Sequence, residues 1–440
     1  MSIRETADAL VAECETRLLP EGIPRRVKLP DLPGKVDAVV GMRRTGKTWL
    51  LYERIHALTQ RGVPRAQMLY LNFEDERLRP LDASALHLFP EALRRRHPQQ
   101  TRGEIWYFFD EIQNVTGWES FVRRLIDEPG AHVAVTGSSA RMLSREIATS
   151  LRGRSLATEV LPFGYDEVLA WHGVPLPERW PPDAATRALL EHHLRGYLQR
   201  GGFPEVQGLT EDLRVRVLQD DVQVVLLRDV AERHGVTNTV ALRALVRRLI
   251  AAPGGRFSVH RLYHDLRSQG IAVSKDLLHA LVGHLEDAFL IATVPIATAS
   301  ESTRNAHPRT CYLADPGLAT ASAWRASPDW GHLLENAAYL ELRRRSCTVS
   351  YVVTAAGTEV DFLATPLTGP SALIQVCADL SDPETRAREL RALQAAMVER
   401  GHAASWIVTL EEEDTISLPE GTVHVVPAWR WLLDRPEGCA

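Results

Sequence analysis

The chain has 440 residues, of which 45% are hydrophobic and 24% are charged, and its formal net charge is −5 at pH 7. This composition predicts a folded globular protein of two to four domains and excludes a long disordered chain. It also excludes a basic field over the whole molecule, although charge can still be segregated by domain. No apolar run reaches the ~18 residues of a membrane span.

The N-terminal segment contains acidic residues and has no apolar stretch of the signal-peptide type. The 5 cysteines are scattered and form no CxxC pair, which favours reduced thiols over a disulfide framework or a zinc site. We therefore expect a cytoplasmic protein with no membrane partner.

The predicted elements begin with a helix and a proline-rich lead-in over residues 1–35. Over residues 36–165, short apolar strands such as VDAVV, QMLYLNF, IWYFFDEIQ and HVAVTGSS alternate with helices. Such alternation indicates βαβ units and a parallel sheet, and therefore an α/β fold.

Residues 166–239 carry mainly helical patterns. Residues 240–300 predict three short helices followed by the apolar run FLIATVPI, which we expect to form a hairpin. Residues 325–440 return to alternating helices and strands and predict a second α/β domain.

Residues 41–48, GMRRTGKT, fit the pattern G-x-x-x-x-G-K-[ST] between a β-branched strand and an amphipathic helix. The pattern predicts a loop whose backbone N–H groups surround phosphates at a helix N-terminus. Lys47 would reach the β- and γ-phosphates of ATP, and Thr48 would bind Mg²⁺. The candidate nucleotide-binding residues are Gly41, Arg43, Arg44, Thr45, Gly46, Lys47, Thr48 and Trp49.

The apolar strand IWYFFDEIQ ends in two carboxylates, Asp110 and Glu111. A buried strand would bring Asp110 beside the phosphate loop to hold Mg²⁺, and would place Glu111 to polarise the attacking water. A pair of acids favours ATP hydrolysis over binding alone.

Polar residues also end the strand HVAVTGSS, where Thr136, Ser138 and Ser139 follow one another closely. Thr136 or Ser138 is a candidate catalytic contact to the γ-phosphate or the lytic water, although a hydroxyl-stabilised turn explains either residue equally well. Next come Arg152 and Arg154. One of them, with Arg154 preferred, would stabilise charge in a neighbouring subunit, or is a surface residue of a loop.

The segments GMRRTGKT, YLNFEDERL, FFDEIQNVTGWESFVRRL, VTGSSARML, LRGRSLATEVLPFGYDEVL and YLQRGGFPEV, in this order, resemble a bacterial and archaeal group of AAA-type ATPases. In that group, a P-loop domain is fused to a C-terminal region of long-unknown function. The resemblance implies an AAA-type P-loop core, a helical lid at 166–239, a winged helix at 240–300 and a restriction-endonuclease-like domain at 325–440. It also implies a homo-oligomer, with a ring as one form, and places Asn72, Glu74 and Asp75 at the nucleotide site or a subunit contact.

A nuclease of that C-terminal type needs acidic residues and a lysine around Mg²⁺. Glu335 and Asp361 match the first positions, but Gln375 and Cys377 stand where an acid and a lysine are needed. We therefore expect a nuclease-like shape without cleavage; Glu359 and Asp379 are substitutes that the spacing does not support.

Basic residues gather between residues 240 and 280, in the segment SVHRLYHDLRSQ–GIAV–SKDLLHALVGHLED and just before it. This pattern is typical of a helix–turn–helix that contacts DNA phosphates with little sequence specificity, although packing or protein contact is the alternative. The candidate DNA-binding residues are Arg243, Arg247, Arg248, Arg261, Arg267 and Lys275.

Three functions follow from these patterns. The first is an ATP-driven motor or remodeller of DNA, with branched or single-stranded DNA as the favoured substrate. The second is a nucleotide-dependent switch or scaffold that holds a protein partner. The third, an ATP-coupled nuclease, is disfavoured by Gln375 and Cys377.

Overall fold

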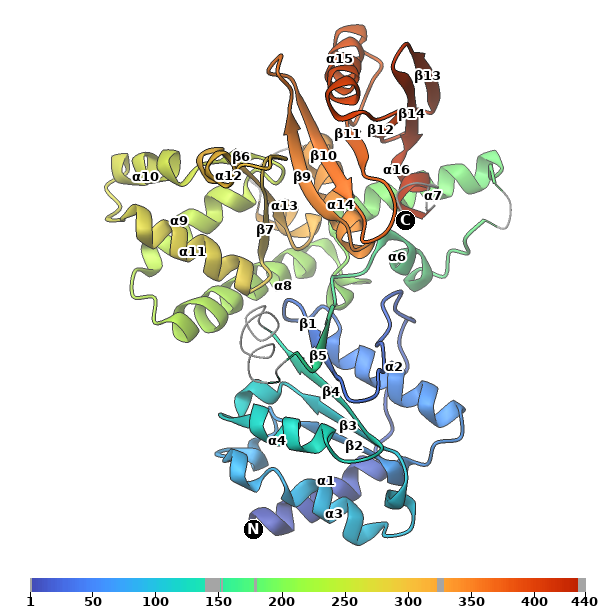
Figure 1. Cartoon of the computed structure of the whole chain (residues 1–440), viewed down its shortest axis with the longest axis vertical. Helices are drawn as coiled ribbons and strands as arrows, with labels where there is room; N and C mark the ends of the chain where they lie inside the picture. Colours follow the sequence, from blue (N-terminus) through green and yellow to red (C-terminus); the bar gives the residue numbers. More distant parts are fainter. Residues whose placement is uncertain (1, 139–150, 152, 178–179, 323–327, 434–440) are drawn as a thin grey trace. The chain divides into compact units, whose positions relative to one another are not determined.

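The computed structural model describes residues 2–138, 151, 153–177, 180–322 and 328–433 (Figure 1). The chain divides into two compact units, residues 1–160 and residues 161–440. Within the described ranges, no helix combines the length and the apolar character needed to cross a bilayer.

The first unit is built on a parallel sheet of 5 strands in the order β2-β3-β4-β1-β5. Strand β4 lies between β3 and β1, so the consecutive strands β1 and β2 are not neighbours in the sheet. This confirms the predicted parallel α/β sheet. The strands are β1 (Val36–Val40), β2 (Met68–Asn72), β3 (Ile105–Asp110), β4 (Ala131–Gly137) and β5 (Ser155–Glu159).

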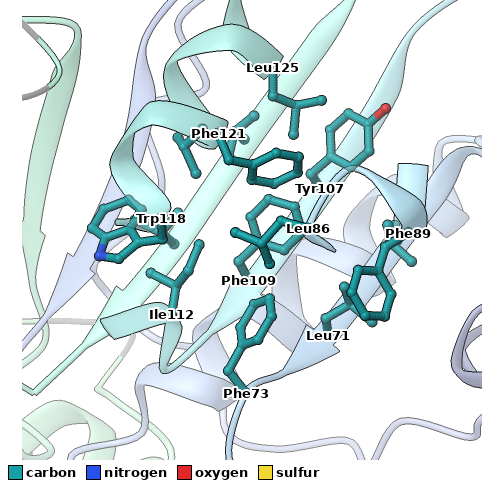
Figure 2. Packing of buried hydrophobic residues seen from close by; sticks show 14 of the residues in the cluster. Leu71, Phe73, Leu86, Phe89, Tyr107, Phe109, Ile112, Trp118, Phe121 and Leu125 are labelled. Atoms are coloured by element: carbon teal, nitrogen blue, oxygen red, sulfur yellow. The ribbon is translucent and has the colours of Figure 1, made fainter. Parts of the chain in front are cut away.

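Alternate residues of the central strands point to opposite faces of the sheet, as the period of a strand requires. Leu71 and Phe109 join one hydrophobic cluster with residues of α1, α3 and α4 (Figure 2), whereas Tyr70 and Phe108 join another with residues of α2. The helices are α1 (Ile3–Thr16), α2 (Lys47–Gln60), α3 (Leu88–Arg96) and α4 (Trp118–Ile126). The 3₁₀ turns are η1 (Arg65–Gln67), η2 (Glu76–Leu78), η3 (Ala83–Ala85), η4 (Gln100–Arg102) and η5 (Ile112–Asn114).

The second unit begins with helices, as its sequence pattern predicts. Helix α8 continues without interruption into η8, a π-helical segment, and the helical backbone extends to His234. The elements are α6 (Tyr165–Trp171), α7 (Ala184–Arg200), η7 (Pro204–Val206), α8 (Glu211–Val224) and η8 (Val225–Glu232).

Five helices, α9 to α13, and a small antiparallel sheet of order β6-β8-β7 follow. Ser258 and Ser274 cap α10 and α11 by accepting hydrogen bonds from backbone N–H groups. The elements are α9 (Thr239–Ile250), β6 (Arg256–Phe257), α10 (Val259–Ser268), α11 (Lys275–Asp287), β7 (Ile291–Val294), α12 (Glu301–Ala306), β8 (Arg309–Leu313) and α13 (Pro316–Ser322).

The run FLIATVPI forms a single strand, β7, and not the hairpin that its apolar character suggested. The partner of β7 is β8, which comes after α12 and beyond residue 300. The run contains no turn-forming pair before Pro295, so nothing within it reverses the chain.

The rest of the second unit is a mixed sheet of 6 strands in the order β13-β14-β12-β11-β10-β9. Strands β11, β12 and β14 pair in parallel, and the other pairs are antiparallel. The elements are α14 (Trp330–Arg344), β9 (Thr348–Val353), β10 (Glu359–Thr365), β11 (Ala372–Val376), α15 (Pro383–Arg400), β12 (Ala404–Thr409), β13 (Asp414–Leu418), β14 (Gly421–Pro427) and α16 (Ala428–Leu433).

Candidate functional site

The glycine-rich loop connects the end of β1 to the start of α2. Gly41 has a φ of 148°, and a Cβ atom there would lie 2.3 Å from the carbonyl oxygen of Val160. Gly46 has a φ of 97° and directly precedes α2. Both positions require glycine, because a side chain would collide with the backbone or strain it. The loop therefore presents its backbone at a helix N-terminus, where anions are stabilised.

Lys47 is the first residue of α2, and its side chain folds back over the loop. Its ammonium group donates hydrogen bonds to the carbonyl oxygens of Gly41 (3.2 Å) and Met42 (3.0 Å). The same Nζ atom lies 3.9 Å from Oε1 of Glu111. A buried cation thus stands between the loop and the acidic end of β3, where it can contact the terminal part of a phosphate chain.

Asp110 ends β3 and accepts hydrogen bonds from three neighbouring hydroxyls. Thr48 and Tyr70 each donate to Oδ2 at 2.8 Å, and Thr136 donates to Oδ1 at 2.6 Å. These donors come from α2, β2 and β4, so strand order and helix position together build the site. An aspartate and a threonine hydroxyl in contact form an oxygen ligand pair of the kind that Mg²⁺ accepts.

Glu111 adopts a left-handed backbone conformation, with a φ of 53°. Its N–H donates to Oγ1 of Thr136 at 2.8 Å, and its side chain accepts from Gln113. Burial raises the pKa of the Glu111 carboxyl, whereas the charge of Lys47 counteracts the rise. A conformation this costly for a non-glycine residue is typical of functional sites.

Thr136 and Ser138 lie at the end of β4, between Asp110 and the glycine-rich loop. Thr136 is committed to holding Asp110 and Glu111, whereas the buried Ser138 hydroxyl has no hydrogen-bond partner among the described residues. Ser138 is therefore the one of the two whose oxygen is available for a ligand. Ser139 and Arg152 lie outside the described residues.

Some of the remaining predicted residues of the first unit lie beside Asp110 and the glycine-rich loop, and others do not. Asn72 pairs with Asp110 across neighbouring strands, and Glu74 lies 3.9 Å from Arg43 of the loop. Asp75 instead caps η2 and pairs with Arg77, so its carboxylate is used locally. Arg44 is exposed and left-handed, with a φ of 64°.

Trp49 is exposed, and its ring is close enough to Gly22 of the lead-in that a Cβ there would lie 2.8 Å from it. Arg154 pairs with Asp127 and immediately precedes β5. Because β5 is parallel to β1, Arg154 lies at the edge of the sheet opposite to the glycine-rich loop. It cannot serve the site of its own chain.

Sequence reasoning missed Tyr70 and Arg25. Tyr70 also hydrogen-bonds Tyr52, and Arg25 is buried and donates to the carbonyl oxygen of Thr45 in the loop at 2.7 Å. Neither residue belongs to a motif. The sequence offered one weak signal, namely that Arg25 is a basic residue in the proline-rich lead-in.

A second group of carboxylates lies in the mixed sheet of the second unit. Glu335 of α14 accepts a hydrogen bond from Tyr312 at 2.6 Å. Asp361 of β10 accepts one from the backbone N–H of Val376 at 2.8 Å, and the Asp361 N–H donates to Gln375 at 3.2 Å. The three nuclease-like positions Glu335, Asp361 and Gln375 therefore lie on adjoining elements.

Burial raises the pKa of Asp361 to about 7 and that of Glu335 well above its usual range. Charge repulsion from Asp361 raises the pKa of Glu335 further, whereas repulsion from Glu389 and Glu359 raises that of Asp361. The Cys377 thiol donates a hydrogen bond to the carbonyl oxygen of Asp379. No lysine follows Lys275 in the sequence. This group therefore lacks the lysine that the nuclease pattern requires, although the charge of Arg256 lowers the pKa of both acids.

The predicted DNA-binding residues lie on three helices, namely α9, α10 and the start of α11. All six are exposed: Arg243, Arg247, Arg248, Arg261, Arg267 and Lys275. Arg267 donates to the hydroxyl of Tyr263 at 2.8 Å, and the Lys275 ammonium lies 5.5 Å from the centre of the Tyr263 ring. Arg248 lies 3.6 Å from Asp265, which offsets part of its charge.

The strand order and the loop–strand geometry define a P-loop protein of the AAA type. In agreement, the family model described as an AAA domain matches residues 34–169, and a domain of unknown function, DUF8612, matches residues 191–328.

The chain is 31% identical over 423 residues to the uncharacterized protein MJ1544 of Methanocaldococcus jannaschii, with 93% of this chain and 91% of that protein covered. It therefore belongs to the same protein family as MJ1544. An uncharacterized protein of Haemophilus influenzae is 28% identical over 333 residues, which cover 75% of this chain and 79% of that protein.

Among solved structures, the Aeropyrum pernix Orc1 protein in complex with DNA is 15% identical, with 73% of this chain and 91% of that chain covered and a TM-score of 0.27. Cdc6p of Pyrobaculum aerophilum is 11% identical, with coverages of 72% and 96% and the same TM-score of 0.27. At these scores, the two alignments add nothing to the strand order described above.

Proposed function

We propose that this protein is an ATPase that hydrolyses ATP to ADP and phosphate with Mg²⁺. The observation that carries the proposal is the continuous set of contacts from Thr48 through Asp110 and Thr136 to the backbone of Glu111, with Lys47 beside it. A purely structural cluster would not need a buried lysine, two acids and a glycine loop at one sheet edge.

Each side chain has a distinct task in the proposed reaction. Loop N–H groups and Lys47 would bind the phosphates, and Thr48 with Asp110 would hold Mg²⁺, which neutralises charge developing on the phosphoryl oxygens. Glu111 would orient and deprotonate the attacking water, and the charge of Lys47 opposes the rise in its pKa that burial causes. Ser138 offers its hydroxyl to the γ-phosphate or to this water.

Trp49 and the lead-in residue Gly22 flank the start of α2 and are the proposed neighbours of the nucleotide base. The test of the whole assignment is phosphate release by the full chain with saturating Mg²⁺ and ATP. Release that exceeds the background of a Lys47→Ala preparation supports it. Equal release by the two preparations, with and without added DNA, would overturn it.

We further propose that the second unit acts on DNA through the face formed by α9, α10 and α11. The order α9–β6–α10–α11–β7–α12–β8, with its small antiparallel sheet, supports the winged-helix interpretation. The exposed arginines and Lys275 suit phosphates, and the ring of Tyr263 between Arg267 and Lys275 offers a flat surface for an unstacked base.

Turnover measured against single-stranded, duplex and four-way junction DNA tests this proposal. The variant Arg247→Glu/Arg248→Glu should lose the stimulation of turnover by DNA. It should also reduce the slope of log binding constant against log salt concentration by about two. Arg386→Glu/Arg391→Glu on α15 makes the same charge change elsewhere and should leave both unchanged. Equal losses in the two variants would indicate a general charge effect and reject this face.

The switch or scaffold function remains the alternative outcome. If no DNA binds at low salt, and ATP still changes the protease sensitivity of the second unit, the protein is a nucleotide-dependent switch. Arg154, at the sheet edge away from its own site, is the proposed contact to a neighbouring subunit in a homo-oligomer. Native mass with and without ATP tests that assembly.

A further inference from the structure

Two histidines and an aspartate meet in the second unit, where the end of the α8–η8 helix packs against α11. His234 ends the first helix, and His284 and Asp287 share one face of α11 at a spacing of three residues. Their ligand atoms all lie within 4.8 Å of one another, and all three residues are half-buried. Elsewhere in the described ranges, no other group of His, Cys, Asp or Glu residues meets this criterion.

The two imidazoles are stacked, with ring centroids 3.8 Å apart and planes inclined by 8°. Two ligand atoms of one tetrahedral ion are roughly 3.4 Å apart when each bond is about 2.1 Å. The ligand atoms here lie within 4.8 Å of one another, so their separation exceeds that of a filled site by at most about 1.4 Å. Rotation of a histidine ring about its Cβ–Cγ bond closes this gap at little cost, because that torsion has a broad minimum.

We propose that His234, His284 and Asp287 form a binding site for a borderline divalent metal ion, with Zn²⁺ as the best match. Imidazole nitrogens select such ions over Mg²⁺, which prefers oxygen ligands and demands octahedral geometry. Three protein ligands leave the fourth coordination position of the ion for a water molecule or for a small molecule that binds there. This site is chemically distinct from the Thr48–Asp110 pair and does not depend on the proposed ATPase activity.

The ion would tie α11 to the end of the α8–η8 helix. No disulfide joins the two elements, because Cys311 and the other described cysteines are free. An ion that binds the folded state raises its stability by mass action. It would also hold in place the helix whose first residue is Lys275.

The chain contains its own control for adventitious binding. His260 and His264 lie one turn apart on α10, with ring centroids 4.6 Å apart, and both are exposed. Histidines at this spacing can bind transition metals weakly, but these two lack a third ligand at the distance found in the proposed site.

The experiment uses tag-free full-length protein that has been stripped with EDTA and returned to chelator-free buffer. Zn²⁺ is then titrated by calorimetry in excess Mg²⁺, and thermal unfolding and the visible absorption of the Co²⁺ form are recorded. We expect one Zn²⁺ per chain, a higher unfolding midpoint with Zn²⁺, and the intense Co²⁺ bands of a four-coordinate site.

Two substitutions, His284→Gln and Asp287→Asn, should each abolish the tight event and the Zn²⁺-dependent rise of the unfolding midpoint. The control His260→Gln/His264→Gln should retain both. Wild-type Zn²⁺ binding by His284→Gln, or loss of binding in the control, would overturn the proposal. If a variant fails to fold, the wild-type protein decides: no Zn²⁺-dependent midpoint shift, or only weak octahedral Co²⁺ bands, rejects the site.

Discussion

The protein has two pairs of acidic side chains at its β-sheets, and the electrostatic surroundings of the two pairs are opposite. In the first unit, Asp110 receives three hydroxyl donors and Glu111 lies beside the buried Lys47. In the second unit, burial raises the pKa of both Glu335 and Asp361, and the charge of Asp361 raises that of Glu335 further. The nearest aromatic hydroxyl, from Tyr312, donates to Glu335 alone.

This comparison shows why acids at a sheet do not by themselves make a catalytic centre. A carboxylate that must stay ionised in a buried place needs a compensating cation or several donors. The first group has both, and the glycine-rich loop lies beside it. The second has Cys377 at the position where the nuclease pattern would require a lysine.

The largest effect should come from the one cation that distinguishes the first group. Lys47→Ala removes the buried ammonium and should weaken ATP binding on the order of 10³-fold, since truncating a buried charged contact costs about 2–5 kcal/mol. Titration of a fluorescent ATP analogue measures this. Lys35→Ala, on the surface, should bind normally, and tight binding by Lys47→Ala would refute the assignment of the phosphate site.

Glu111→Gln separates binding from chemistry. The amide keeps the shape of the side chain but cannot take a proton, so turnover should fall on the order of 10²-fold while ATP affinity stays near the wild-type value. Because burial raises the pKa of Glu111, wild-type turnover should also decline at a higher pH on acidification than an ordinary glutamate would give. Glu104→Gln is the matched control; an unchanged rate in Glu111→Gln would remove this residue from the mechanism.

The second group makes the opposite prediction, because its acids destabilise the fold when ionised. Asp361 has a pKa near ~3.9 in the unfolded chain and about 7 in the folded one, so the folded state binds more protons between these values. The free energy of unfolding should therefore fall as pH rises from about 4 to about 7.

Asp361→Asn keeps the acceptor for the Val376 N–H and removes the charge. It should be more stable than wild type by about 2 kcal/mol at pH 8 and of similar stability near pH 4, as measured by urea unfolding. The exposed Asp379 has a lowered pKa through its bonds to Ser381, so Asp379→Asn should gain no stability at pH 8. Loss of stability in Asp361→Asn at pH 8 would contradict this account.

The smallest effect tests a residue that positions Asp110. Tyr70→Phe removes one of three hydroxyl donors, and a single hydrogen bond to a charged group contributes about 1.5–3 kcal/mol. Because Thr48 and Thr136 remain, we expect the Mg²⁺ concentration needed for half-maximal turnover to rise roughly tenfold, with little change in the maximal rate. Tyr52→Phe, which leaves the bond from Tyr70 to Asp110 intact, should behave as wild type; an equal shift in both variants would show a packing effect.

Local patterns predicted the parallel sheet of the first unit well, because the glycine-rich loop, the acidic strand end and the strand periodicity are all short-range features. The same patterns failed at FLIATVPI, where the paired residues of the partner strand lie 16 to 22 positions further along the chain. Thr136 was proposed as a contact to the nucleotide, but only the register of β3 and β4 shows that its hydroxyl is used to hold Asp110.

The sequence by itself determined the phosphate loop and its two acids, since each depends on residues that are neighbours in the chain. Tertiary structure alone decided which hydroxyls surround Asp110, that Arg25 supports the loop, and that His234 meets His284 and Asp287. These contacts join residues far apart in the chain. They exist because burying the apolar faces of strands and helices sets the order in which the elements pack, and no local pattern encodes that order.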